Sequence, residues 1–209
     1  MCDHGHNHTG CSHESSDTPT ASDHFRYDLR SYIDFDRVTV LNEAVDDAGK
    51  EVFKTMETRN DRTIFVDSDC DEELLFNIPF TGHVKLSGLA ISGDENETHP
   101  AKIRIFKDRE AMSFDDCRIA ADQEIDLKMD ANGVVDYPLK ASKFANIHHL
   151  AIHVAKNFGA DATRVYYIGL RGEFQHEFRS KIAIATYESR AQLKDHKSEI
   201  PDAVGHSLF

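Results

Sequence analysis

The sequence predicts an all-β protein of the sandwich or jelly-roll type. Apolar and polar residues alternate in many short segments, turn-forming residues separate many of these segments, and no segment has the periodicity of an amphipathic helix longer than two turns. Because there is no alternation of strands with helices and no GxGxxG motif, a nucleotide-binding α/β fold is not expected. With 209 residues, 40% of them apolar, the chain is long enough for one domain with tails.

Nine segments have the pattern of strands. The segment 73–80, ELLFNIPF, is apolar almost throughout, which is typical of a strand that is buried on both faces. Gly88 interrupts the alternation of the next segment and predicts a bulge or a bend. In chain order the nine segments are 37–41, 73–80, 83–93, 102–106, 124–129, 134–139, 149–155, 165–174 and 181–187.

Turn-forming residues mark the ends of several of these strands. They predict turns at Thr81–Gly82, at 96–100, at 131–133 and at 157–161. Many short strands joined in this way are typical of antiparallel β-sandwiches.

The two ends of the chain have the composition of tails. Residues 1–24 contain no Ile, Leu, Val or Phe, so they cannot bury enough apolar surface to offset the entropy of ordering. The last residues carry only scattered apolar side chains. We therefore expect a disordered His-rich tail at 1–24, a domain at 25–188 and a flexible tail at 189–209.

Hydropathy and charge limit the compartments and partners that we expect. No segment approaches 18 consecutive apolar residues and the N-terminus has no apolar signal region, so we expect no membrane span and a cytoplasmic protein, with the nucleus as a second compartment. A formal net charge of -13 argues against binding to nucleic acid or to anionic lipid. The negative charge favours a partner with a basic surface, or it serves only to keep the protein soluble. No feature indicates an oligomeric state.

The N-terminal tail contains the residues of a hypothetical metal site. After removal of Met1, the α-amine of Cys2, two deprotonated backbone amides and the imidazole of His4 could bind Cu(II) or Ni(II) in a square plane. Separately, His4, His6 and His8 alternate, and Cys2, Cys11 and His13 could complete a tetrahedral zinc set. A structural metal site needs ligands that the fold holds in place, and nothing in this segment would hold them. We therefore expect a polar tail and assign no metal and no cofactor.

The segment 67–73, DSDCDEE, places five acidic residues in seven positions. An EF-hand is excluded because position 6 of that register is Glu72 and position 12 is Ile78. A looser calcium loop is an alternative, but we expect a solvated turn or a charged patch for a basic partner, with Asp69, Asp71 and Glu72 as contacts.

No pattern in the sequence predicts catalysis. His149 and His153 share a strand face at about 13 Å, which is too far for one metal ion, so we expect them to pack in the core. Acidic neighbours of Cys70 and Cys117 disfavour the thiolate. There is no nucleophile elbow and no P-loop. The expected function is therefore not enzymatic.

Four stretches carry a resemblance to a known family: DEELLFNIPFTG at 71–82, MSFDD at 112–116, NIHHLAIHVAKNFGADATRVYYIGLRGE at 146–173 and IATYE at 184–188. The sequence resembles the PITH domain, a proteasome-interacting module that also occurs behind a thioredoxin domain. The resemblance implies a jelly-roll sandwich that is galactose-binding-like, and a protein partner, the regulatory particle of the 26S proteasome. The thioredoxin domain and its CxxC motif are absent here, so redox activity is not implied.

The family motif supplies no catalytic residues. Its strand positions are expected to pack in the core, and they are Leu74, Leu75, Phe76, Ile78 and Phe80. Its loop residues Asn157 and Asp161 are candidates for partner contact or for forming the turn, and His206 is a candidate contact in the C-terminal tail.

Three functions stay open at this point. The first is an adaptor or regulator of the proteasome. The second is a module for a small ligand such as carbohydrate, which rests on fold analogy alone. The third is a regulator that uses the His-rich tail as a metal sensor.

Overall fold

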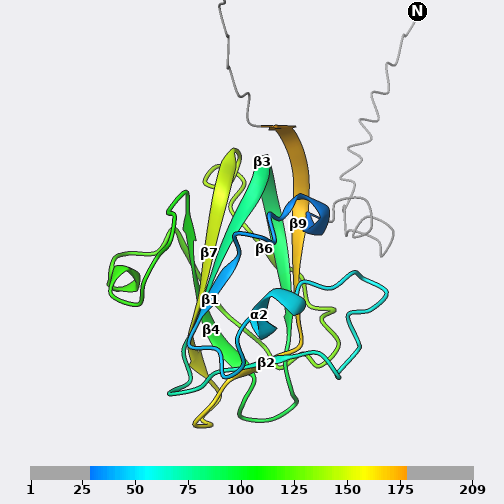
Figure 1. Ribbon diagram of the computed structural model, residues 1–209, viewed down its shortest axis with the longest axis vertical. Helices are drawn as coiled ribbons and strands as arrows, with labels where there is room; N and C mark the ends of the chain where they lie inside the picture. Colours follow the sequence, from blue (N-terminus) through cyan, green and yellow to red (C-terminus); the bar gives the residue numbers. More distant parts are fainter. Residues whose placement is uncertain (1–28, 178–209) are drawn as a thin grey trace, which may run out of the picture. The chain divides into compact units, whose positions relative to one another are not determined.

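A computed structural model describes residues 29–177, which form nine β-strands and only short helical segments. The helical segments are η1 (Arg30–Tyr32), α2 (Ala48–Glu51) and η2 (Asp116–Arg118). The predicted all-β class is confirmed (Figure 1). The strands are β1 (Thr39–Leu41), β2 (Val66–Asp67), β3 (Leu74–Ser92), β4 (Pro100–Lys107), β5 (Gln123–Asp126), β6 (Tyr137–Pro138), β7 (Ile147–Asn157), β8 (Arg164–Val165) and β9 (Tyr167–Glu177).

The 19-residue strand β3 connects the two layers of the sandwich. Its first part pairs antiparallel with β1 and β7, and this layer continues to β4 and β5. Its second part, from Gly82 to Ser92, pairs with β9, while Gly88 and Leu89 also pair with β6. A strand that changes layers in this way is a known means of closing a sandwich at a corner.

The turn predicted at Thr81–Gly82 is absent, and both residues lie inside β3. The register with β7 shifts between Pro79 and Val84, so the strand bends without ending. Gly82 is required for close approach: a Cβ on it would lie 2.5 Å from the carbonyl oxygen of His176. Glycine at a close approach of two strands and glycine in a turn look the same in a single sequence.

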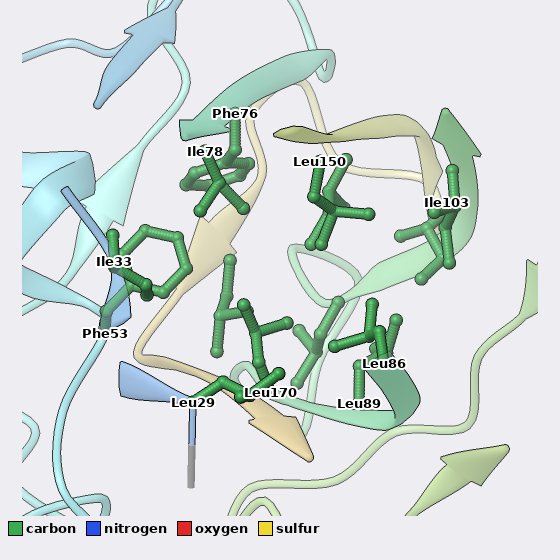
Figure 2. Close-up of a cluster of buried hydrophobic side chains, with 14 of the residues drawn as sticks. Leu29, Ile33, Phe53, Phe76, Ile78, Leu86, Leu89, Ile103, Leu150 and Leu170 are labelled. Atoms are coloured by element: carbon green, nitrogen blue, oxygen red, sulfur yellow. The ribbon is translucent and has the colours of Figure 1, made fainter. Parts of the chain in front are cut away.

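The main core lies between the two layers. Figure 2 shows Phe76, Ile78 and Leu150 of one layer facing Leu86 and Leu170 of the other. The family-motif residues are fully buried as expected. They face both sides of the sheet, which confirms the prediction for 73–80.

The second face of β3 is covered by the segment 108–122. Leu75 packs there in a smaller cluster with Phe106 and Ala151, and Met112 and Cys117 cover them. The layer that contains β3, β7 and β4 is therefore buried on both faces over this region.

The other strand predictions agree in part. Gly88 marks a bulge, because the register with β9 shifts between Leu86 and Gly88. The segment 165–174 is divided between β8 and β9, and β8 pairs with β2, a two-residue strand that alternation did not predict. The segments 124–129 and 134–139 form shorter strands than expected. The predicted strand 181–187 and both predicted tails lie outside the described residues.

Candidate functional site

Four loops meet at one end of the sandwich, at the bottom of Figure 1. They are residues 42–47, 67–73, 94–99 and 157–163, and we call them together the acidic end. Backbone hydrogen bonds join each loop to another: Ala44 N donates to Asp67 O (2.9 Å), Ser68 N to Thr163 O (3.0 Å) and Phe158 N to Glu97 O (3.1 Å).

An ion pair holds the two central loops of the acidic end together. Arg164 of β8 donates two hydrogen bonds of 2.6 Å to the two carboxylate oxygens of Asp67 in β2. Its guanidinium also lies 4.2 Å from the ring centroid of Phe65. The hydrogen bond to the Asp67 carboxylate raises the pKa of Arg164. Because a bidentate pair has fixed geometry, the loops on either side are positioned relative to each other.

Asn42 organises the acidic loop 67–73, a role that its sequence context did not reveal. Its side-chain amide donates to the carbonyl oxygen of Glu73 at 2.7 Å and to Asp71 Oδ1 at 2.8 Å, and its Oδ1 accepts from Cys70 N at 3.0 Å. Its backbone has φ of 66°, which asparagine tolerates better than most residues. The only signal of this role in the sequence was the position of an asparagine between two predicted strands.

The side chain of Asn157 holds the turn of its own loop, which is one of the two roles proposed for it from the sequence. Its amide donates to the carbonyl oxygens of Ala160 (2.8 Å) and Ala162 (3.1 Å), and its Oδ1 accepts from Gly159 N (2.9 Å). Thr163, at the end of the same loop, joins this loop to the acidic loop 67–73, because its hydroxyl donates to Glu72 O at 2.6 Å.

The sequence-predicted contact residues are thus brought together from two loops about 90 positions apart. Asp69, Asp71 and Asp161 are exposed, and Glu72 and Asn157 are half-buried. The other candidates, Cys2, His4, His6, His8 and His206, lie outside the described residues.

The acidic end combines negative charge with exposed apolar side chains. Its four loops contain three, five, three and one acidic residue, respectively, and no lysine or arginine. Phe158 at the tip of one loop is 39% exposed and Val45 in another is 67% exposed. Exposed aromatic and aliphatic side chains within a charged rim are typical of protein-interaction surfaces.

The cysteines of residues 29–177 have raised pKa values, and no metal-binding cluster is found in this range. Within this range there is no cluster of three or more His, Cys, Asp or Glu side chains that could hold a metal ion. The pKa of Cys70 is raised by its hydrogen bond to Asp69, as the acidic neighbours predicted. The pKa of Cys117 is raised to about 11, and here burial is the main cause rather than the acidic neighbour.

His149 and His153 are buried in β7, which confirms that they belong to the core. Burial lowers the pKa of both imidazoles, and the hydrogen bond of 2.6 Å between His153 Nε2 and Glu73 Oε2 partly opposes this effect. Within residues 29–177 His149 has no such bonded carboxylate. Glu110 and Asp108 raise its pKa, while His148 and Arg37 lower it.

We expect the free energy of unfolding to fall as the pH drops below about 6.5. The unfolded chain binds protons at its histidines near this pH, whereas the folded chain resists protonation of His149 and His153 because their folded pKa values are lowered. Urea denaturation at pH 7.5, 6.5 and 5.5 measures this dependence. His149→Phe removes one of the two groups and should flatten the curve; curves of equal slope for the two proteins would contradict the prediction.

No helix within residues 29–177 is long and apolar enough to cross a membrane. The two layers and the ordered loops at one end together define the class of this protein, a β-sandwich domain.

The chain belongs to the PITH domain family, whose model matches residues 19–191. It is 70% identical to PITH domain-containing protein ZK353.9 of Caenorhabditis elegans over 209 residues, which covers 100% of both chains. It is 46% identical to PITH domain-containing protein 1 of Homo sapiens over 198 residues, which covers 93% of both chains. The resemblance found in the sequence motifs is thereby confirmed.

The fold is similar to that of solved carbohydrate-binding modules. One match is a structure of the CBM32-1, CBM32-2 and M60 catalytic domains of Clostridium perfringens ZmpB, with a TM-score of 0.52 and 8% identity over 73% of this chain and 16% of that one. At this identity the likeness concerns the fold alone. It confirms the expected jelly-roll β-sandwich.

Proposed function

We propose that this chain is a non-enzymatic adaptor or regulator that binds the regulatory particle of the 26S proteasome through the acidic end. It acts in the cytoplasm and also in the nucleus. The observation that carries the proposal is the joining of two loops about 90 residues apart into one rigid acidic surface. Membership of the PITH domain family supports a protein partner.

The geometry of the acidic end suits recognition of a basic protein surface. Asn42, Asn157 and Thr163 hold the loops by hydrogen bonds within the chain, so little conformational entropy is lost when a partner binds. The unpaired acidic side chains steer a basic partner to this end. Phe158, partly exposed among them, provides an apolar anchor.

The triple variant Asp69→Asn, Asp71→Asn, Glu72→Gln should bind purified regulatory particle at least about tenfold more weakly at low salt, because long-range attraction is lost. Asparagine at 71 retains the oxygen that accepts from Asn42, so the loop should keep its shape. Binding is measured by surface plasmon resonance at two salt concentrations, and the variant should also show a weaker dependence on salt.

The matched control removes three negative charges elsewhere. Glu110→Gln, Asp115→Asn and Asp126→Asn alter exposed residues outside the acidic end and should change the affinity less than about threefold. Equal losses in both variants would mean that net charge alone is responsible. Absence of binding by the unaltered chain at low salt would refute the proposal.

A further inference from the structure

A pocket of about 400 Å³ lies against β3 and β9, and none of its lining residues belongs to the loops of the acidic end. Ala90 is half-buried while its neighbours Leu89 and Ile91 are each 1% exposed and belong to the core. Ala90 therefore faces outward, and the pocket is on the outer side of the sheet. Its lining includes Met56, Arg59, Ala90, Val134, Tyr167 and Gly169, together with two acidic residues, the exposed Glu57 and the ion-paired Asp136.

Small residues form the hollow in this face. Ala90 pairs with Gly169 across the two strands, and the Tyr167 ring lies over Gly169, so the hollow is left above Ala90. The absence of a side chain at Gly169 also admits the Tyr167 ring, because a Cβ there would collide with its phenol oxygen. The volume is within the range of small-ligand sites, which begins at about 300 Å³.

One wall of the pocket carries an arginine whose charge is already neutralised by an aspartate. Arg171 pairs with Asp136 through hydrogen bonds of 3.0 and 2.6 Å, and it also donates to Ser87 Oγ at 3.1 Å. Its guanidinium is therefore already occupied. Val134, at 61% exposure, adds an apolar side chain to the lining.

Arg59, also in the lining, has a different environment. Its Nη1 contacts only the sulfur of Met56, at 2.7 Å, and its buried Nε has no acceptor. Within residues 29–177 no carboxylate lies within ion-pair distance of it, in contrast to Arg62, Arg164 and Arg171. A thioether is a weak acceptor, so the guanidinium retains both its charge and unmet donors beside the pocket.

We propose that this pocket binds a ligand in which an apolar group carries a carboxylate. The apolar group lies over Ala90 and against Val134 and the Tyr167 ring, and the carboxylate pairs with Arg59, because a guanidinium is the side chain that best matches a carboxylate. Two sources have this chemistry, the free carboxyl terminus of a peptide with an apolar last residue and a small carboxylic acid. The pocket is independent of the proteasome proposal because it shares no residue with the acidic end.

Isothermal titration of the full chain distinguishes the two sources. The probes are an acetylated hexapeptide ending in Leu-Phe with a free carboxylate, the same peptide as its amide, and 4-phenylbutyrate. We expect the free acid of at least one scaffold to bind. Binding by the peptide alone identifies a chain terminus, and binding by phenylbutyrate alone identifies a small acid. Binding by neither, or equal binding of the acid and the amide, would overturn the proposal.

Two variants locate the binding. Arg59→Met keeps an unbranched side chain without charge and should weaken binding of the free acid about tenfold or more. Arg118→Met is the control, because Arg118 is 83% exposed and pairs with Asp115 outside the pocket. Ala90→Leu fills the hollow without altering Arg59 and should also weaken binding. If circular dichroism shows that the Arg59 variant is not folded, the Ala90 variant tests the proposal in its place. Unchanged affinity in a folded Arg59 variant, or in the Ala90 variant, would exclude this pocket.

Discussion

Replacing Phe76 with alanine should lower the free energy of unfolding by about 3–5 kcal/mol. Phe76 is fully buried near the start of β3, where it pairs with Val40 of β1 on one side and Ile152 of β7 on the other. Its ring also lies edge-on to that of Phe53, with centroids 6.2 Å apart. Truncation leaves a cavity between two layers whose strands cannot move independently, so the site should collapse only partly. Urea denaturation followed by circular dichroism measures the change.

Phe158→Ala is the matched control for this prediction. It removes the same atoms from a loop tip where the side chain is 39% exposed, and it should cost less than about 1 kcal/mol. A loss below about 2 kcal/mol for Phe76→Ala, which is the lower limit for large core truncations, would show that this part of the core repacks.

Replacing Asn77 with leucine should lower the free energy of unfolding by about 2–6 kcal/mol. Asn77 is buried on the second face of β3, and its side chain pairs with the backbone of Met112 in both directions. The amide donates to Met112 O at 3.1 Å, and Oδ1 accepts from Met112 N at 3.0 Å. Leucine has a similar volume but leaves both backbone groups buried without a partner, which costs about 1–3 kcal/mol for each group.

The segment 108–122 should also become more accessible in this variant, because the two hydrogen bonds attach it to the sheet. Hydrogen exchange at the Met112 amide measures this effect beside urea denaturation. Asn132→Leu is the control: Asn132 is exposed and makes no side-chain hydrogen bond within residues 29–177, so its replacement should change stability by less than about 0.5 kcal/mol. Normal protection at Met112 in the Asn77 variant would contradict the proposed attachment.

The acidic end illustrates how far a candidate site can be predicted from sequence. Asp69 and Asp71 were visible as part of an acidic run, and Asp161 as part of a turn. Their common surface was not visible, because Thr163 and Arg164 join the loops to residues 91 and 97 positions away. Asn42 was missed for the same reason, since its partners lie 28 to 31 positions further on.

What the sequence determined by itself is the all-β class, the two-sided burial of 73–80 and the core positions of His149 and His153. These follow from alternation and apolar runs, which are local because side chains of neighbouring strand residues point to opposite faces. Tertiary structure alone decided that β3 continues through Thr81–Gly82, that the acidic loops share one end, and that Arg59 has no acidic partner within residues 29–177. These features depend on which distant strands pair, and local periodicity carries no information about that choice.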